Sequence, residues 1–288
     1  MRFELTDEQR GFGQSLTDLM RSADSVSVAR SWAEGDTAPG QDLWKRLADQ
    51  GVTALVAPED EGGLGGTLID LAVAFEVLGH ELAVGPWIES AALAPQVDGA
   101  MVTAAAPPLA AYAADAHVAR LLSGVAGEQH GSVDTTRTLT EVADPDPFDD
   151  VALDRAVLAC AAELLGAGER VLADSVAYAK QRRQFGREIG SYQAVKHQLA
   201  DVRIGLDFAR PLVFGAALGE VPVSAAKVAA ADAAYRAART GLQVHGAIGY
   251  TAEFDLSLWL GRIRALVTAW GTPAYHRARV LDVITGAR

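Results

Sequence analysis

The spacing of apolar residues constrains the fold most, because it follows a helical period on both sides of a short non-helical stretch. Residues 6–92 read as successive amphipathic helices, and Val157, Ala161 and Leu164 begin the same three-and-four spacing in the second half. Between these blocks, valines and threonines in residues 131–142 favour strands. The chain is therefore expected to be mostly α, with little strand.

Three units are expected, since 288 residues exceed the size of a usual single domain. They are an N-terminal helical domain (residues 1–94), a reduced middle β-unit (95–147) and a C-terminal four-helix-type bundle (148–288). Within the bundle, Ser191 is expected to cap the second helix and Pro211 to interrupt it. So small a β-unit needs support from packing against the helices.

Charge and composition exclude several functions. The formal net charge of −12 argues against a nucleic-acid partner. Cys160 is the only cysteine, so an intrachain disulfide cannot form and a reducing compartment is favoured. The N-terminus shows no export segment, and no apolar run is long enough to cross a membrane, so a cytoplasmic protein is expected. No metal-ligand spacing accompanies His245 or His276, and no metal is expected.

Two motifs carry a resemblance to a known family. Residues 178–201 read YAKQRRQFGREIGSYQAVKHQLAD, and residues 243–251 read QVHGAIGYT. Together with residues 44–66 they closely resemble the acyl-CoA dehydrogenase family, and the resemblance covers most of the chain except its middle. Gly249, inside the second motif, is expected to end a helix.

The resemblance implies FAD as the cofactor. FAD needs a cation with several donors, a close backbone approach and an apolar surface for its adenine, and Arg182, Gly246 and Phe185 are residues of those kinds. In the family, residues matching Arg182, Phe185, Gln243 and Gly246 reach the adenine-pyrophosphate end of an FAD held mainly by a neighbouring subunit. Gln193 is a further cofactor-binding candidate. Taken singly, a solvated Arg182 and an ordinarily packed Phe185 are the alternatives, and their occurrence together favours cofactor contact.

The middle unit departs from the family pattern. The resemblance implies that ordinary family members have a middle domain about twice as long as residues 95–147, with a strand motif and a tryptophan beside the flavin ring. Residues 95–147 contain no tryptophan and no such motif. The chain is therefore not expected to enclose a flavin ring alone.

The catalytic base is the second departure. Removal of the proton alpha to the thioester carbonyl requires a carboxylate, which most members carry just before a Gly-Thr pair. Here Trp270 occupies that position, and residues 256–281 contain no aspartate or glutamate. Because an indole cannot accept this proton, no catalytic residue is expected in this chain, and Trp270 is expected to act as an apolar plug.

Asp154 is the weaker candidate for a base. Some family members carry the glutamate on an earlier helix, and the segment beginning at Asp154 resembles that region. Aspartate is shorter than glutamate, and a carboxylate in a first helical turn also serves capping or solvation. His245 and His276 are further candidates for a base, but neither is expected to act in the chemistry, and His245 is expected to serve structure or cofactor contact.

The resemblance is strongest to a shortened subunit of heteromeric, steroid-degrading acyl-CoA dehydrogenases that assemble as α2β2. It implies a homologous partner subunit carrying the catalytic glutamate, a bulky acyl-CoA substrate and an electron acceptor such as an electron-transfer flavoprotein. The isolated chain is then expected to be inactive. Two alternatives remain open: a self-sufficient homo-oligomer with Asp154 as base, and a flavin-free structural or regulatory subunit.

Overall fold

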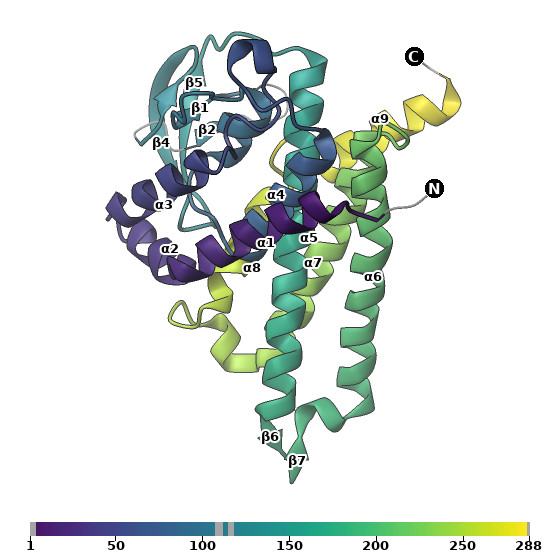
Figure 1. Ribbon diagram of the computed structural model, residues 1–288. Coiled ribbons are helices and arrows are strands. Elements are labelled where there is room, and N and C mark those ends of the chain that lie inside the picture. Colours follow the sequence, from purple (N-terminus) through teal and green to yellow (C-terminus); the bar gives the residue numbers. More distant parts are fainter. Residues whose placement is uncertain (1–3, 107–111, 115–117, 287–288) are drawn as a thin grey trace.

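Helices dominate the structure, a computed structural model that describes residues 4–106, 112–114 and 118–286 (Figure 1). This confirms the expected mostly α class. None of the described helices is long and apolar enough to cross a membrane. The N-terminal part comprises α1 (Asp7–Ser22), α2 (Ser25–Ala33), α3 (Ala38–Asp49), the 3-10 turn η1 (Glu59–Glu61), α4 (Leu68–His80) and the π-helical turn η2 (Ile88–Leu93).

Reciprocal capping fixes the starts of α1 and α4. The Thr6 hydroxyl accepts from the Gln9 backbone N–H, and the Gln9 side chain accepts from the Thr6 N–H. Thr67 and Asp70 repeat this arrangement at α4. Gln9 Nε2 also donates to Asp70 Oδ1 at 3.0 Å, so the two capped ends are joined.

The middle unit contains two small sheets. In one, β1 (Val102–Thr103) pairs in parallel with β3 (Arg120–Leu121). In the other, β5 (Thr138–Ala143) lies between β2 (Tyr112–Ala114) and β4 (Val125–Gly131), antiparallel to both.

The strands expected from residues 131–142 are present at the two ends of this stretch. β4 ends at Gly131 and β5 begins at Thr138, with a turn between them. Within the turn, Asp134 Oδ1 accepts from the Thr136 backbone N–H at 3.0 Å and from the Thr136 hydroxyl at 2.7 Å. These side chain to backbone bonds compete with a strand ladder.

The C-terminal part is built around α5 (Asp150–Gln181), which packs against α4, α6 (Gln193–Ala217) and α7 (Val223–His245). Figure 1 shows α5, α6 and α7 side by side, with a hairpin at their far end. The remaining elements are β6 (Arg183–Gln184), β7 (Arg187–Glu188), η3 (Ile189–Ser191), η4 (Gly246–Tyr250), α8 (Leu256–Leu266) and α9 (Pro273–Thr285).

Two expectations about α6 were wrong. The helix begins at Gln193 without a side-chain cap, because the Ser191 hydroxyl donates instead to the Glu188 carbonyl at 2.7 Å. It also continues through Pro211 to Ala217. Pro211 is exposed, so water can reach the carbonyl that its missing N–H leaves free.

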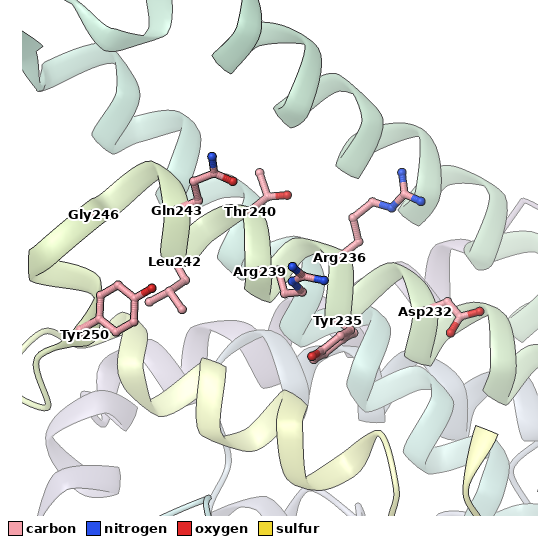
Figure 2. A pocket seen from close by; sticks show the side chains of 9 residues that line it. All are labelled: Asp232, Tyr235, Arg236, Arg239, Thr240, Leu242, Gln243, Gly246 and Tyr250. Atoms are coloured by element: carbon pink, nitrogen blue, oxygen red, sulfur yellow. The ribbon is translucent and has the colours of Figure 1, made fainter. Parts of the chain in front are cut away.

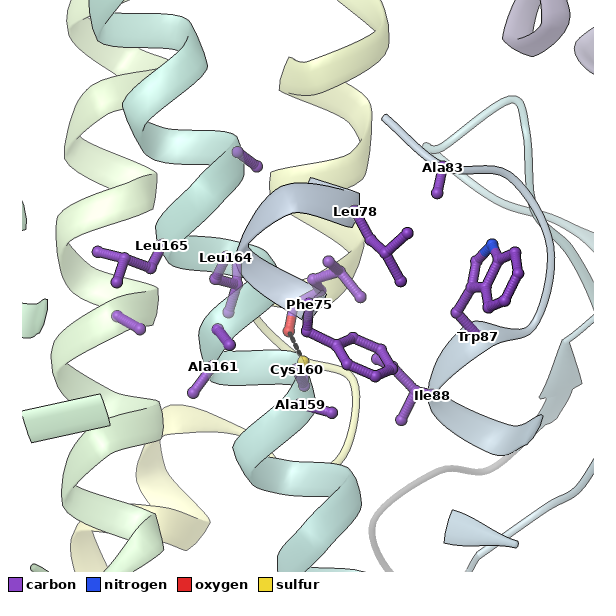
Figure 3. Packing of buried hydrophobic residues seen from close by; sticks show 14 of the residues in the cluster. Phe75, Leu78, Ala83, Trp87, Ile88, Ala159, Cys160, Ala161, Leu164 and Leu165 are labelled. Atoms are coloured by element: carbon purple, nitrogen blue, oxygen red, sulfur yellow. Dashed lines mark hydrogen bonds between the residues drawn. The ribbon is translucent and has the colours of Figure 1, made fainter. Parts of the chain in front are cut away.

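The core is continuous from the N-terminal helices into the bundle. Phe75 and Leu78 of α4 pack beside α5 near Cys160, as Figure 3 shows. Burial raises the pKa of the Cys160 thiol, whose Sγ lies 3.6 Å from the Leu266 carbonyl. Because a thiolate is the reactive form, this cysteine is an inert core residue.

A buried ion network joins all three parts of the chain. Arg262 of α8 contacts Asp134 of the middle unit at 2.5 Å and Glu163 of α5 at 2.7 Å, and it donates to the Ala83 carbonyl at 2.9 Å. Burial opposes ionisation, but Asp134 and Glu163 raise the pKa of Arg262 above its ordinary value. Burial also opposes ionisation of Asp134, but Arg262, the Thr136 hydroxyl and Arg137 together lower the pKa of this carboxyl.

Candidate functional site

The first motif forms the hairpin at the far end of α5. The Arg182 N–H donates to the Tyr178 carbonyl at 2.8 Å, and the chain then leaves the helix. Phe185 and Gly186 form the two-residue loop between β6 and β7, with φ of 51° and 84°. Positive φ at both positions is the pattern of a type I′ turn. The Phe185 side chain is 92% exposed at the tip that projects beyond the bundle (Figure 1).

Several contacts hold this hairpin rigidly. The Ile189 N–H donates to the Arg182 carbonyl at 2.8 Å, and the Tyr192 hydroxyl donates to the Gln184 carbonyl at 3.2 Å. The Arg187 guanidinium stacks 4.0 Å above the Tyr192 ring. The side chain of Arg182, by contrast, makes no hydrogen bond or ion pair with any described residue, so a free cation lies at the base of a fixed hairpin.

The second motif forms the end of α7. The helix ends at His245, and Gly246 has φ 62° and ψ −137°, a conformation that only glycine adopts readily. Gly246, and not Gly249 as expected, therefore terminates the helix. A Cβ at Gly246 would meet no described heavy atom within 4 Å, so the backbone is open to close approach. Gln243, one turn earlier, is exposed.

Ring stacking brings the two motifs to the same end of the bundle. The Tyr178 ring lies on the His245 ring with centroids 4.3 Å apart, and Phe254 packs against the other side at 5.1 Å. The His245 Nδ1–H donates to the Gly241 carbonyl at 2.8 Å. This tautomer leaves Nε2 as an acceptor, and it is buried with no partner among the described residues. His245 therefore serves chiefly to dock α7 onto α5.

A groove runs along the outer face of α7 from this end (Figure 2). Gln243 and Gly246 were expected at a cofactor site, whereas sequence reasoning missed Arg236 and Arg239. The available signal was their spacing of seven and four residues before Gln243, which places all three on nearby parts of one helix face. The full lining is Asp232, Tyr235, Arg236, Arg239, Thr240, Leu242, Gln243, Gly246 and Tyr250.

Gln193 does not line this groove. It is the first residue of α6 and is exposed. The structure thus gathers Arg182, Phe185, Gln243 and Gly246 at one end of the bundle. Gln193 lies at the same end, where α6 begins directly after the hairpin and η3.

Trp270 lies in a closed environment between α8 and α9. Its side chain is 1% exposed, with φ of 56°, and Gly271 follows with φ of 104°. The His276 Nε2–H donates to the Trp270 carbonyl at 2.8 Å, while His276 Nδ1 accepts from the Ser224 hydroxyl at 3.0 Å. Burial lowers the pKa of His276 to about 4, and the nearby charge of Lys227 acts in the same direction.

Asp154 lies near this closed environment but is itself half-exposed. Its Oδ1 is 3.0 Å from a guanidinium nitrogen of Arg279, on the same helix as His276. The neighbouring Lys227 is 1% exposed and donates to the Leu266 carbonyl at 2.6 Å, which caps the end of α8. Of the side chains named around Trp270, Asp154 carries the carboxylate, and it is already paired with Arg279.

The two sets of candidate residues lie at opposite ends of α5. Asp154 is in its second turn, and Arg182 follows its last turn. At 1.5 Å of rise per residue, about 42 Å of helix separates them. An extended dinucleotide flavin is much shorter than this, so the two ends cannot serve the same flavin within one chain.

The fold defines the class of this protein. The family model of the acyl-CoA dehydrogenase N-terminal domain matches residues 6–129 of the sequence. The family model of the acyl-CoA dehydrogenase C-terminal domain matches residues 150–285. The chain belongs to the acyl-CoA dehydrogenase family. Among its relatives is acyl-CoA dehydrogenase IpdE2 of Mycobacterium tuberculosis (strain ATCC 25618 / H37Rv), 32% identical over 291 residues that cover 89% of this chain and 91% of the relative.

Solved structures share the fold. The ChsE4-ChsE5 complex from Mycobacterium tuberculosis matches with a TM-score of 0.80 at 22% identity, over 99% of each chain. A glutaryl-CoA dehydrogenase from Mycobacterium smegmatis in complex with FADH2 matches with a TM-score of 0.79 at 16% identity, over 98% of this chain and 95% of that one. The family assignment agrees with FAD as the expected cofactor.

The residues present fit one half of FAD. An unpaired guanidinium, an exposed aromatic ring, an amide and an open glycine suit the adenine and diphosphate. They do not supply a wall for the flavin ring. Where the middle unit meets the bundle, the charged network of Arg262, Asp134 and Glu163 is fully buried.

Proposed function

We propose that this chain is the base-less subunit of a heteromeric FAD-dependent acyl-CoA dehydrogenase, an α2β2 assembly that desaturates a bulky acyl-CoA between its alpha and beta carbons. The separation of about 42 Å along α5 between the open hairpin end and the closed Trp270 end carries the proposal. The open end faces outward and is suited to a flavin whose ring lies in another subunit. Among the described residues of the closed end, the carboxylate near Trp270 is that of Asp154, which is already paired with Arg279.

In this assignment Arg182 binds the phosphate anions through its forked donors, and Phe185 covers the flat adenine. Gln243 supplies an amide, and Gly246 allows the backbone to approach closely. The flavin, when bound, supplies the hydride acceptor, while every contact assigned to this chain is with the dinucleotide half. Gln193 remains a proposed contact at the start of α6.

The partner subunit supplies the catalytic glutamate and the walls around the flavin ring. On this chain, Trp270 keeps water out of the position that the glutamate has in other members, and His276 holds the Trp270 carbonyl. Because this chain then contributes no active site of its own, the assembly has room for a large substrate such as a steroid-derived acyl-CoA, as the resemblance implies. An electron-transfer flavoprotein is the proposed electron acceptor.

The proposed unit boundaries remain those expected from the sequence, at residues 1–94, 95–147 and 148–288. In this division the middle unit is too small to enclose a flavin ring, and it depends on Arg262 of the bundle for the neutralisation of Asp134. The small middle unit therefore both fails to enclose a flavin ring and needs the bundle to neutralise its buried carboxylate.

Co-expression tests this function. The chain is produced alone and together with an acyl-CoA dehydrogenase homologue encoded next to it, and flavin content and acyl-CoA-dependent flavin reduction are measured. We expect a colourless, inactive chain alone and a yellow, active complex. Full flavin loading and turnover by the chain alone would contradict the proposal.

A self-sufficient homo-oligomer with Asp154 as base is the second candidate, favoured by the partial exposure of this carboxylate. Its contact with Arg279 occupies an oxygen needed for proton transfer. In that case Asp154→Asn abolishes turnover. In the heteromeric case the variant retains turnover within about twofold, because the partner's glutamate takes the proton.

A further inference from the structure

The groove on α7 extends beyond the residues that the two motifs supply, and it carries two arginines without partners. We propose that Arg239 is a further cofactor-binding residue, which contacts the diphosphate of the same flavin from the α7 side. This inference rests on the proposed function, because it assigns an additional residue to the same dinucleotide site.

Charge pairing singles out these arginines. Acidic residues outnumber Lys and Arg by 37 to 25, and most described arginines contact a carboxylate or a carbonyl. Among the described arginines without such a partner, Arg46 donates to the Ser22 hydroxyl and Arg187 stacks on the Tyr192 ring. Within the same described part of the chain, the side chains left without any polar or ring partner are those of Arg182, Arg236, Arg239 and Arg264. Arg236 and Arg239 are also three residues apart on one helix, so they repel each other until an anion neutralises them.

Helical register places Arg239 within reach of the expected diphosphate. It precedes Gln243 by one turn, or about 6 Å of rise, on the same face of α7. Figure 2 shows its side chain between Tyr235 and Leu242, along the groove that Gln243 and Gly246 continue. A guanidinium there can form charge-assisted hydrogen bonds to phosphate oxygens that also approach the open backbone of Gly246.

The groove has the chemistry of a nucleotide site. Tyr235 and Tyr250 are 41% and 76% exposed, so aromatic surface lies on both sides of Arg239. Cations beside flat apolar rings suit a diphosphate joined to an aromatic base better than they suit an acidic peptide. The continuity of this groove with Gly246, where a Cβ would meet nothing, also favours a ligand that approaches the backbone.

Arg236 provides a matched control on the same helix. It is also exposed and unpaired, but it lies one turn further from Gln243 and also lines a second groove with Ile204 and Phe208 between α6 and α7. Replacement of Arg236 or Arg239 by glutamine removes the same charge from the same face. A purely long-range electrostatic effect would therefore be similar for both.

The test uses the complex of this chain with its co-purified partner, stripped of flavin and titrated with FAD while flavin fluorescence is followed. Arg239→Gln is expected to raise the Kd for FAD by about tenfold to a hundredfold, as lost charged hydrogen bonds do, and Arg239→Lys by less. Arg236→Gln is expected to change it less than about threefold. Equal effects of the two glutamine variants would overturn the assignment of Arg239.

The variant Arg182→Gln distinguishes failure of the Arg239 assignment from failure of the proposed function. If Arg182→Gln weakens FAD binding and Arg239→Gln does not, the assignment of Arg239 fails while the proposed function stands. If neither variant changes the Kd, the proposed dinucleotide contact itself fails. If Arg239→Gln instead dissociates the subunits in size-exclusion chromatography without changing the Kd, the groove binds an acidic surface of the partner, and the inference is overturned.

Discussion

Phe185 and Trp270 are both bulky aromatic residues with positive φ, but their surroundings are opposite. Phe185, with φ of 51°, is 92% exposed at the hairpin tip, whereas Trp270, with φ of 56°, is 1% exposed. Left-handed backbone is unfavourable for such residues and persists only where other interactions compensate. Burial compensates at Trp270. At Phe185 the backbone of the paired hairpin compensates, while the side chain itself remains exposed.

This contrast extends to the surrounding residues. Around Trp270, His276 is held by two hydrogen bonds and Asp154 by an ion pair. At the other end, Arg182 has no side-chain partner among the described residues. The closed end is a packed core, whereas the open end leaves a cation and an aromatic ring exposed.

Replacement of Trp270 by glutamate gives the largest expected effect, because it tests whether the closed end could regain a base. It removes a buried ring and introduces a buried charge, so we expect unfolding free energy to fall by about 5 kcal/mol. The measurement is chemical denaturation, with Trp270→Phe as a milder control. A stable Trp270→Glu protein that reduces flavin with acyl-CoA would show that the closed end is a preserved active site.

Arg262→Met tests the buried ion network, which is a second region, besides the surroundings of Trp270, that is shielded from solvent. It leaves Asp134 and Glu163 buried without their cation, so we expect a loss of about 3 to 5 kcal/mol in unfolding free energy. Far-UV and near-UV circular dichroism follow the transition in denaturant. Arg264→Met, on the exposed side of the same helix, should change the free energy by less than about 0.5 kcal/mol. Equal losses would contradict the role assigned to the network.

The pH dependence of stability tests the closed state of His276. Its folded pKa of about 4 lies below the ordinary 6.5, so the unfolded chain takes up the proton first and stability falls as the pH drops from about 6.5 towards 4. This group should contribute a loss of about 2 kcal/mol between pH 7 and pH 5. His276→Gln, which does not titrate, should show a correspondingly shallower loss. Parallel pH profiles would mean that the ring is accessible to protons in the folded chain.

Phe185→Asn gives the smallest expected change in stability, and in the opposite direction. Asn-Gly is a favoured pair for a type I′ turn, so the isolated chain should gain about 0.5 kcal/mol while flavin binding by the complex weakens. Thermal unfolding of the chain and FAD titration of the complex measure the two effects. Phe185→Leu, which keeps apolar bulk without the ring, should retain part of the affinity. A destabilised isolated chain would show that Phe185 serves its own hairpin.

The helical architecture and the two motifs could be predicted from the sequence, because helix periodicity and motif spacing are local. The turn between the two strands of residues 131–142 could not be located from the sequence, because Asp134 and Thr136 join a buried network whose cation lies 128 residues away. Pro211 was expected to interrupt α6, but one lost hydrogen bond at an exposed position is tolerated within a long packed helix. The spacing of Arg239 before Gln243 was visible in the sequence, but the folded chain was needed to show that this arginine lacks a carboxylate partner among the described residues.

The network of Arg262 also sets an order of events during synthesis. Asp134 and Glu163 leave the ribosome well before Arg262, which follows Glu163 by 99 residues. Until then both carboxylates must remain hydrated, because their burial without a cation is strongly unfavourable. The contact of the middle unit with the bundle therefore closes late, after α8 is made. A chain truncated before α8 would expose the same surface permanently and become a substrate for chaperones and proteases.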